Sequence, residues 1–254
     1  VLRGKSIGEV KAIIFDKDGT LLNSEDRLTR LCQSRIEQAI CIYKRSNVKD
    51  EALSNLRTLL NSAYGFKNKG LDPHGCLAIA SRSNNLISTA TIFCLLGESW
   101  ANSLDIANEI FNSADIAIKN KLNTGETHEM LPGALEFIQK LEKNGTYLGL
   151  ITNDTKEGIR KFLRINKLEN SFQSLWSSED YPPKPDPNAV RGLCKVLKKK
   201  ESECALIGDA DTDLRMARKS NVGLVIGYTA GWSSEPLLYE YDHLIHHWDE
   251  LSIQ

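Results

Sequence analysis

Four short and almost continuously apolar runs punctuate the chain, at residues 12–15, 148–151, 205–207 and 222–226. Runs of this length and composition are typical of strands in a parallel sheet that is covered on both faces. Helix-like stretches separate the later runs, at residues 134–143, 156–165 and 188–199. This alternation predicts an α/β fold with a doubly wound, Rossmann-like parallel sheet.

The segment from residue 25 to residue 129 has a different pattern. It lacks strand-like runs and shows helical periodicity that is interrupted at glycines such as Gly65 and Gly70. We therefore expect an all-helical cap domain of residues 25–129, inserted into an α/β catalytic core of residues 1–24 and 130–254. Because the insertion follows the first strand and ends before the second, we expect it at the carboxyl edge of the sheet, where α/β proteins bind ligands.

Composition and charge narrow the class of protein. The chain is 41% hydrophobic and 26% charged, and its 32 basic and 33 acidic side chains give a formal net charge of -1. This balance predicts a globular protein without a field that attracts nucleic acid or an anionic membrane surface. The six cysteines are scattered, and no apolar run is long enough for a signal peptide or a membrane span. We expect a cytoplasmic protein; the sequence indicates no particular oligomeric state.

The strongest candidate for chemistry follows the first apolar run directly. Residues 16–20 read Asp-Lys-Asp-Gly-Thr, so Asp16 and Asp18 are two positions apart at a strand end and should project together. Two carboxylates this close repel each other unless a cation lies between them or one is protonated. An ordinary Asp-Gly turn is an alternative for this short motif. An EF-hand is excluded, because its bidentate glutamate would fall at Arg27.

Polar clusters also follow the later apolar runs. Thr152 and Asn153 follow the second run and offer a hydroxyl, an amide and backbone donors that suit an anion near a helix start. Lys184 lies on a proline-bounded turn before a helix. A second group of acids follows the run at 205–207: Asp209, Asp211 and Asp213. Each cluster alone could be a cap, a turn or a solvated loop, but their joint occurrence at one sheet edge favours a shared site.

Taken in order, these motifs resemble those of the haloacid dehalogenase superfamily of phosphohydrolases. The matching segments are residues 16–20, Thr152 with Asn153, Lys184 with Pro185, and Gly208-Asp209 with Asp213. The resemblance spans about residues 10 to 230. The helical insertion is similar to that of the family's phosphoglycolate phosphatase-like branch.

The resemblance implies roles for the acids. Asp16 would be the nucleophile, and Asp18 the general acid and base. Mg²⁺ would be held by Asp16, the main-chain carbonyl of Asp18, and Asp209. Asp213 would order metal-bound water or a lysine from outside the ligand set. The nearby acids Asp154 and Asp211 are expected to face solvent.

Three further residues would bind the phosphate: Thr152, Asn153 and Lys184. Attack by one anion on another is disfavoured until charge is neutralised, so phosphoryl transfer needs a metal ion and a lysine near the phosphate. Substrate identity would depend on the cap. There, Arg82 could pair with a substrate carboxylate, although a position on a helix surface is the preferred interpretation.

These features predict a Mg²⁺-dependent phosphatase of small phosphorylated metabolites that works through an aspartyl-phosphate, with a phosphoglycolate-like monoester favoured by the resemblance. A dehalogenase is disfavoured because a halide leaves without a proton, which makes Asp18 unnecessary. Two alternatives stay open. A phosphomutase of the β-phosphoglucomutase kind shares every motif, and a non-catalytic phosphate-binding protein is less favoured because it would be expected to lose one of the key residues.

Overall fold

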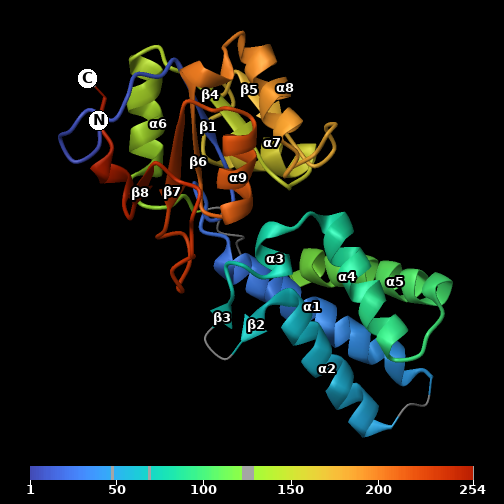
Figure 1. Ribbon diagram of the computed structural model, residues 1–254. Helices are drawn as coiled ribbons and strands as arrows, with labels where there is room; N and C mark the ends of the chain where they lie inside the picture. Colours follow the sequence, from blue (N-terminus) through green and yellow to red (C-terminus); the bar gives the residue numbers. More distant parts are fainter. Residues whose placement is uncertain (47–48, 68–69, 122–128, 254) are drawn as a thin grey trace. The chain divides into compact units, whose positions relative to one another are not determined.

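The computed structural model describes residues 1–46, 49–67, 70–121 and 129–253 (Figure 1). The chain divides into two compact units, which we call the core unit (Val1–Ser24 with His128–Gln254) and the helical unit (Glu25–Thr127). No helix in the described ranges has both the length and the apolar composition needed to cross a membrane.

A six-stranded parallel sheet forms the centre of the core unit (Figure 1). Its strands are β1 (Ala12–Phe15), β4 (Tyr147–Ile151), β5 (Ser174–Trp176), β6 (Cys204–Gly208), β7 (Leu224–Tyr228) and β8 (His243–Ile245). They are arranged in the order β5-β4-β1-β6-β7-β8. The strand order therefore reverses between β1 and β6, the point at which doubly wound sheets bind their ligands. The predicted α/β fold class is confirmed.

Helices cover both faces of this sheet. One face is covered by α6 (Ala134–Lys143) and α7 (Lys156–Ile165), and the other by α8 (Pro187–Leu197) and α9 (Asp211–Lys219). Side-chain alternation along β1 explains the two layers. Ile13 and Phe15 belong to the hydrophobic cluster on the α6 and α7 side, whereas Ala12 and Ile14 belong to the cluster on the α8 and α9 side.

Short connections complete the core unit. Two 3-10 helices, η1 (Glu201–Glu203) and η2 (Trp248–Glu250), lie before β6 and after β8. The two ends of the chain lie side by side (Figure 1), because the Val1 amino group donates to the carbonyl oxygen of Ser252 and Leu2 forms a bridge with Leu251.

The sequence pattern located most of these elements. The expected helices at 134–143 and 156–165 coincide with α6 and α7. The expected helix at 188–199 is instead Pro187–Leu197, because Asp186 caps its start and Lys198 ends it with a left-handed φ of 55°. Strands β5 and β8 were not expected, since each has only three residues and begins with a polar side chain.

The helical unit contains five helices in its described residues: α1 (Glu25–Lys44), α2 (Asp50–Tyr64), α3 (Cys76–Ile79), α4 (Arg82–Leu95) and α5 (Trp100–Lys121). α1 packs against α2 and α5, and α4 packs against α5. The expectation of a segment without strands needs one correction. A two-residue antiparallel pair, β2 (Phe66–Lys67) with β3 (Gly70–Leu71), lies between α2 and α3. Strands this short show no periodicity in the sequence.

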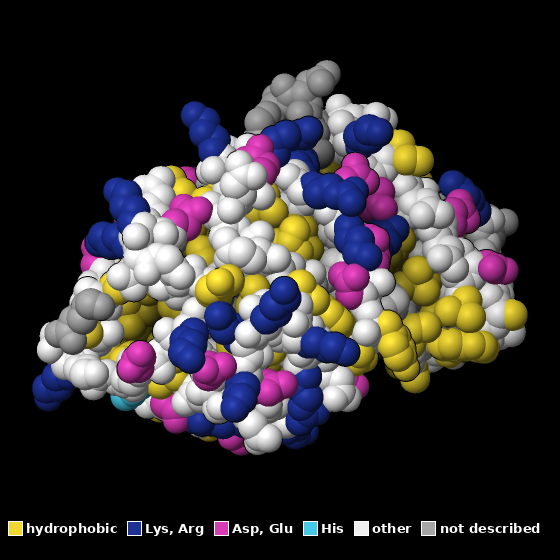
Figure 2. Space-filling model, turned by 90° about the horizontal axis from the view of Figure 1, so that it is seen from above, with side chains coloured by type: hydrophobic (Ala, Val, Ile, Leu, Met, Phe, Trp, Pro, Cys, Tyr) yellow, Lys and Arg dark blue, Asp and Glu magenta, His cyan; other side chains and the backbone are white. Residues whose placement is uncertain are grey.

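Charged side chains of both signs are intermingled on the face that Figure 2 displays. Lys and Arg side chains stand beside Asp and Glu side chains over much of this face. The pattern agrees with the near-zero net charge of the chain. Any anionic ligand would therefore depend on local groups rather than on a general basic surface.

Candidate active site

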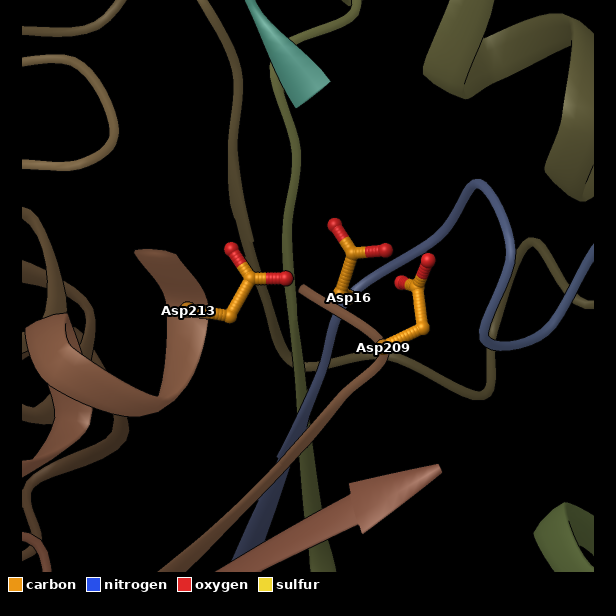
Figure 3. A group of neighbouring side chains, drawn as sticks. All are labelled: Asp16, Asp209 and Asp213. Carbon is orange, nitrogen blue, oxygen red and sulfur yellow. The ribbon is translucent and has the colours of Figure 1, made fainter. Parts of the chain in front are cut away.

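Three buried aspartates meet at the carboxyl edge of the sheet. Asp16 directly follows β1, Asp209 directly follows β6, and Asp213 lies in the first turn of α9. One carboxylate oxygen from each residue lies within 4.8 Å of the others, and Figure 3 shows the three side chains around one space. The placement follows from topology, because β1 and β6 are paired neighbours at the point where the strand order reverses.

Lys184 places a positive charge against this group. Its Nζ donates to Asp16 Oδ1 at 2.6 Å and lies 2.7 Å from Asp213 Oδ1, and its side chain is only 5% exposed. Burial alone would lower the pKa of Lys184, but the charges of Asp16 and Asp213 outweigh it and raise that pKa. The lysine therefore stays charged beside the acids.

The three acids and one lysine leave a buried excess of negative charge. Burial, followed by the charges of Asp16 and Asp213, raises the pKa of Asp209 well above its ordinary value. Burial also raises the pKa of Asp213 to about 6, although the Lys184 ammonium opposes that rise. A divalent cation would relieve the repulsion. The group offers only carboxylate oxygens, which are ligands that Mg²⁺ prefers, so these residues fit the ion.

Asp209 is oriented by two hydrogen-bond donors. Thr20 Oγ1 donates to its Oδ1 at 2.8 Å, and Trp232 Nε1 donates to its Oδ2 at 2.6 Å. The chain can pass this close because residue 19 is glycine: a Cβ on Gly19 would lie 2.2 Å from Asp209 Oδ2. The sequence interpretation missed Trp232. It lies a few residues beyond the end of β7, so the strand-end rule that located the other residues would also have pointed to it.

Asp18 has different partners from Asp16. The Ser24 hydroxyl donates to Asp18 Oδ1, and Lys17 Nζ lies 2.9 Å from Asp18 Oδ2. The expectation that the side chains of Asp16 and Asp18 project together assumed a strand, but β1 ends at Phe15. Among the described residues, the group that could share a metal ion through side chains contains Asp213 rather than Asp18.

The segment between β4 and α7 carries the expected phosphate-binding residues. Thr152 directly follows β4 and is buried, and its Oγ1 accepts the backbone N–H of Asp154 at 3.2 Å. Asn153 is half-buried beside it. Helix α7 then begins after Thr155, whose Oγ1 accepts the N–H of Gly158. Thr152, Asn153 and the start of α7 therefore lie at the same sheet edge as Asp16, because β1 and β4 are paired neighbours.

A family model described as "haloacid dehalogenase-like hydrolase" matches residues 10–221 of this chain. The chain belongs to the haloacid dehalogenase-like hydrolase family. This membership confirms the resemblance seen in the sequence motifs and makes the protein an enzyme of the hydrolase class.

Relatives of this hydrolase cover most of its length. A phosphoglycolate phosphatase of Vibrio parahaemolyticus is 22% identical over 235 residues, which are 88% of this chain and 87% of the relative. A phosphoglycolate phosphatase of Rhodospirillum rubrum is 25% identical over 232 residues, which are 89% and 83% of the two chains. The solved structure of a predicted phosphoglycolate phosphatase from Haemophilus somnus has a TM-score of 0.68 at 16% identity, covers 96% and 97%, and shows the shared fold.

Two acids of the hydrolase that were expected to face solvent are engaged instead. Asp154 Oδ2 lies 2.7 Å from Lys17 Nζ. Asp211 is paired with Arg215 one turn later on α9 at 2.6 Å, and its side chain is 14% exposed. The Asp154 side chain is still 30% exposed, so it faces solvent in part, whereas Asp211 is mostly covered. The Asp211–Arg215 pair has the i,i+4 spacing of neighbours on a helix, but the contact of Asp154 with Lys17 joins distant parts of the chain, and sequence spacing could not predict it.

Arg82, the candidate for substrate recognition, lies at the start of α4 in the helical unit. Its Nη2 is 2.8 Å from Asp115 Oδ2, and its guanidinium lies 5.0 Å from the centre of the Phe111 ring. The arginine and its partner are 44% and 48% exposed. These contacts favour the interpretation of Arg82 as a helix-surface residue.

Proposed function

We propose that this hydrolase is a Mg²⁺-dependent phosphatase that cleaves small phosphorylated metabolites through an aspartyl-phosphate on Asp16. The observation that carries the proposal is the buried group of Asp16, Asp209 and Asp213 with Lys184 between two of its members. Such a group combines a carboxylate nucleophile with a lysine cation and with carboxylates that would hold Mg²⁺, and an anionic substrate requires such cations.

Asp16 would begin the reaction by attacking phosphorus. A carboxylate needs no separate base for this step. Because Oδ1 of Asp16 accepts the Lys184 hydrogen bond, the other carboxylate oxygen is the better candidate for the attack. A bond then forms between this oxygen and phosphorus while the bond from phosphorus to the ester oxygen breaks.

The charge of the phosphoryl group must be neutralised throughout. Lys184 is placed to do so from the Asp16 side, and Thr152 and Asn153 would donate to the phosphoryl oxygens from the β4 edge. Mg²⁺, held by Asp16, Asp209 and the main-chain carbonyl of Asp18, would supply further positive charge and orient the substrate. Asp213, whose Oδ1 holds Lys184, would keep the lysine in place.

Asp18 would serve as the acid and then the base. It would donate a proton to the departing ester oxygen, and later take one from the water that attacks phosphorus and frees Asp16. The two acids need unlike surroundings for these unlike roles. Their different partners support this division, since Asp16 contacts Lys184 whereas Asp18 contacts Ser24 and Lys17.

A phosphoglycolate-like monoester is the favoured substrate, and the support for it is the two relatives named phosphoglycolate phosphatase that align over most of this chain. We further propose that the helical unit acts as a cap that sets specificity. Its links to the core unit are the crossing between Ser24 and Glu25 and a second one around residues 127–129, most of which lies outside the described residues.

The decisive experiment is a screen of phosphorylated metabolites with purified protein and Mg²⁺, which follows both released phosphate and transfer to added sugars. We expect phosphate release that stops on chelation and returns with Mg²⁺, with the highest kcat/KM for a short carboxylated monoester. Acid-quenched protein should carry one phosphoryl group on the peptide that contains Asp16. Transfer to a sugar without net release would indicate a phosphomutase, and inactivity toward every ester would contradict the proposal.

A further inference from the structure

Lys17 is a buried lysine that lies between two acids. Its side chain is 3% exposed, and its Nζ is 2.9 Å from Asp18 Oδ2 and 2.7 Å from Asp154 Oδ2. One acid follows β1 and the other follows β4. The ammonium therefore joins the ends of two neighbouring strands.

Lys17 and Asp16 are neighbours in the chain but have different surroundings. The Nζ of Lys17 lies 5.9 Å from the centre of the Phe162 ring on α7. Asp16 instead accepts a hydrogen bond from the Nζ of Lys184. The site thus uses two lysines: Lys184 contacts the acid that would be phosphorylated, and Lys17 contacts Asp18.

The Asp154 end of this link is held firmly. Its Oδ1 accepts the N–H of Thr155 at 2.7 Å, and a Cβ on Gly158 would lie 2.2 Å from its Oδ2. Glycine at position 158 thus allows the carboxylate to lie against the first turn of α7. A buried ammonium is stable only when its charge is paired, so Lys17 is constrained to stay between its two carboxylates.

We propose that Lys17 is a positioning residue for Asp18. Anchored by Asp154, its ammonium sets the orientation of the carboxylate that protonates the leaving group, while Ser24 holds the other oxygen of that carboxylate. This inference rests on the proposed function, because it concerns the acid of that reaction. Lys17 contacts this acid, and the proposed role is one that it exerts through Asp18.

The test uses the sensitivity of kcat/KM to the leaving group, because that parameter reports the step in which the ester oxygen departs. An alkyl phosphate needs a proton from the acid, whereas p-nitrophenyl phosphate has a leaving group that departs without one. Lys17→Met keeps the length of the side chain and removes its charge. We expect kcat/KM for the alkyl ester to fall about tenfold or more, and that for the aryl ester to fall less than about threefold. Lys17→Arg should restore part of the loss.

Two further variants separate positioning from a merely structural role. Lys156→Met makes the same chemical change at a half-exposed lysine that pairs with Asp180 on the same unit, and it should leave the ratio of the two esters unchanged. Asp154→Asn should shift the ratio in the same direction as Lys17→Met but less. In the Lys17→Met background it should cause no further shift, because the two residues act as one link.

The ester ratios of these variants test the positioning role of Lys17 separately from the phosphatase proposal. An equal loss on both esters, or an unchanged ratio in both Lys17→Met and Asp154→Asn, would overturn the positioning role while leaving the phosphatase proposal standing. If Lys17→Met does not fold, the ratio in Asp154→Asn decides alone. A wild-type protein that hydrolyses no phosphate ester in Mg²⁺ would overturn the proposed function, and this inference with it.

Discussion

The indole N–H of Trp232 donates a 2.6 Å hydrogen bond to Oδ2 of Asp209. The tryptophan is 7% exposed and the aspartate 3%. Gly231 makes this contact possible, because a Cβ there would lie 1.7 Å from the carbonyl oxygen of Gly19. The segment after β7 thus packs against the loop after β1 and holds the orientation of a candidate metal ligand.

Trp232→Phe should therefore weaken Mg²⁺ binding. Residues that orient a ligand are typically worth about 10- to 100-fold in metal affinity, so we expect the Mg²⁺ concentration for half-maximal activity to rise by about tenfold or more. Calorimetric titration of Mg²⁺ should show the same weakening without any substrate.

Trp248→Phe is the matched control for this change. It removes a buried indole from the same unit, and Trp248 Nε1 has no hydrogen-bond partner among the described residues. We expect this variant to lower stability and to leave the Mg²⁺ requirement unchanged. Equal Mg²⁺ affinity in Trp232→Phe and wild type would show that the hydrogen bond does not support the ligand.

Asp16→Asn should abolish turnover and leave the fold intact. An amide is a poor nucleophile, and loss of a covalent nucleophile costs about 10⁴-fold or more in kcat. The amide oxygen can still accept the hydrogen bond from Lys184, and Asp213 still pairs with that lysine, so the circular dichroism spectrum should stay that of the folded protein. Mass spectrometry of acid-quenched protein should find the phosphoryl adduct in wild type only. Near-normal turnover in a folded Asp16→Asn protein would exclude Asp16 as the nucleophile.

Much of this site followed from a single rule, that the carboxyl ends of parallel strands meet at one edge. Asp16, Thr152 and Asp209 each come directly after a strand whose apolar run is visible in the sequence. The rule points to the sheet edge at which Trp232 lies, just beyond β7, but it does not predict which residues Trp232 and Lys17 contact. A lysine between two aspartates is usually a solvated residue, and only the packing of α7 and of the segment after β7 brings these side chains to their partners.

The fold, too, has parts that the sequence predicts and parts that it does not. Strands β1, β4, β6 and β7 are central in the sheet, so both of their faces are buried and their sequences are continuously apolar. Strands β5 and β8 are the edges of the sheet and have three residues each, with Ser174 and His243 at their starts. Edge strands need less apolar surface, which leaves little periodicity for a sequence-based prediction.

Lys184→Met should damage stability as well as catalysis. It leaves Asp16 and Asp213 buried without their cation, and breaking a buried ion pair costs about 3 to 5 kcal/mol. Urea unfolding in a chelator should show a loss of this size, and part of it should return with Mg²⁺, which pairs the same acids. Activity should fall for every phosphate ester alike, because the lysine faces the group that all of them share.

Lys195→Met is a suitable comparison, since Lys195 is an exposed lysine in the last turn of α8. It should alter neither the unfolding free energy nor the activity by much. If Lys184→Met unfolds at the same midpoint urea concentration as wild type, this lysine does not stabilise the buried cluster.

Arg82→Ala should leave the ranking of substrates unchanged. Arg82 is paired with Asp115 and stacked on Phe111, and the pair is about half exposed. Exposed ion pairs contribute about 0 to 1 kcal/mol, so the stability of the helical unit should fall only slightly. The measurement is the ratio of kcat/KM between a carboxylated and an uncharged phosphate ester. A ratio that falls about tenfold in Arg82→Ala would instead assign Arg82 to a substrate carboxylate.

Mg²⁺ should stabilise the folded protein. The variant Asp209→Asn tests whether it does so by binding to the buried carboxylates. The pKa of Asp209 is raised in the folded protein, so its ionised form destabilises the fold as the pH rises above the ordinary carboxyl range. Replacing it with an uncharged amide should therefore raise the melting temperature in a chelator at neutral pH. The same change removes a metal ligand, so the gain on adding Mg²⁺ should shrink.

The rise in melting temperature that Mg²⁺ causes in the wild-type protein is the reference for Asp209→Asn. A ligand at about 100 times its Kd adds roughly 2.7 kcal/mol to folding stability, which is several degrees in melting temperature for a protein of this size. We expect wild type to show a shift of this order with Mg²⁺ and Asp209→Asn to show a clearly smaller one from a higher starting point. Asp186→Asn, at the helix cap of α8, should keep the wild-type response. If Mg²⁺ shifts wild type and Asp209→Asn equally, the ion binds elsewhere and the three aspartates do not form its site.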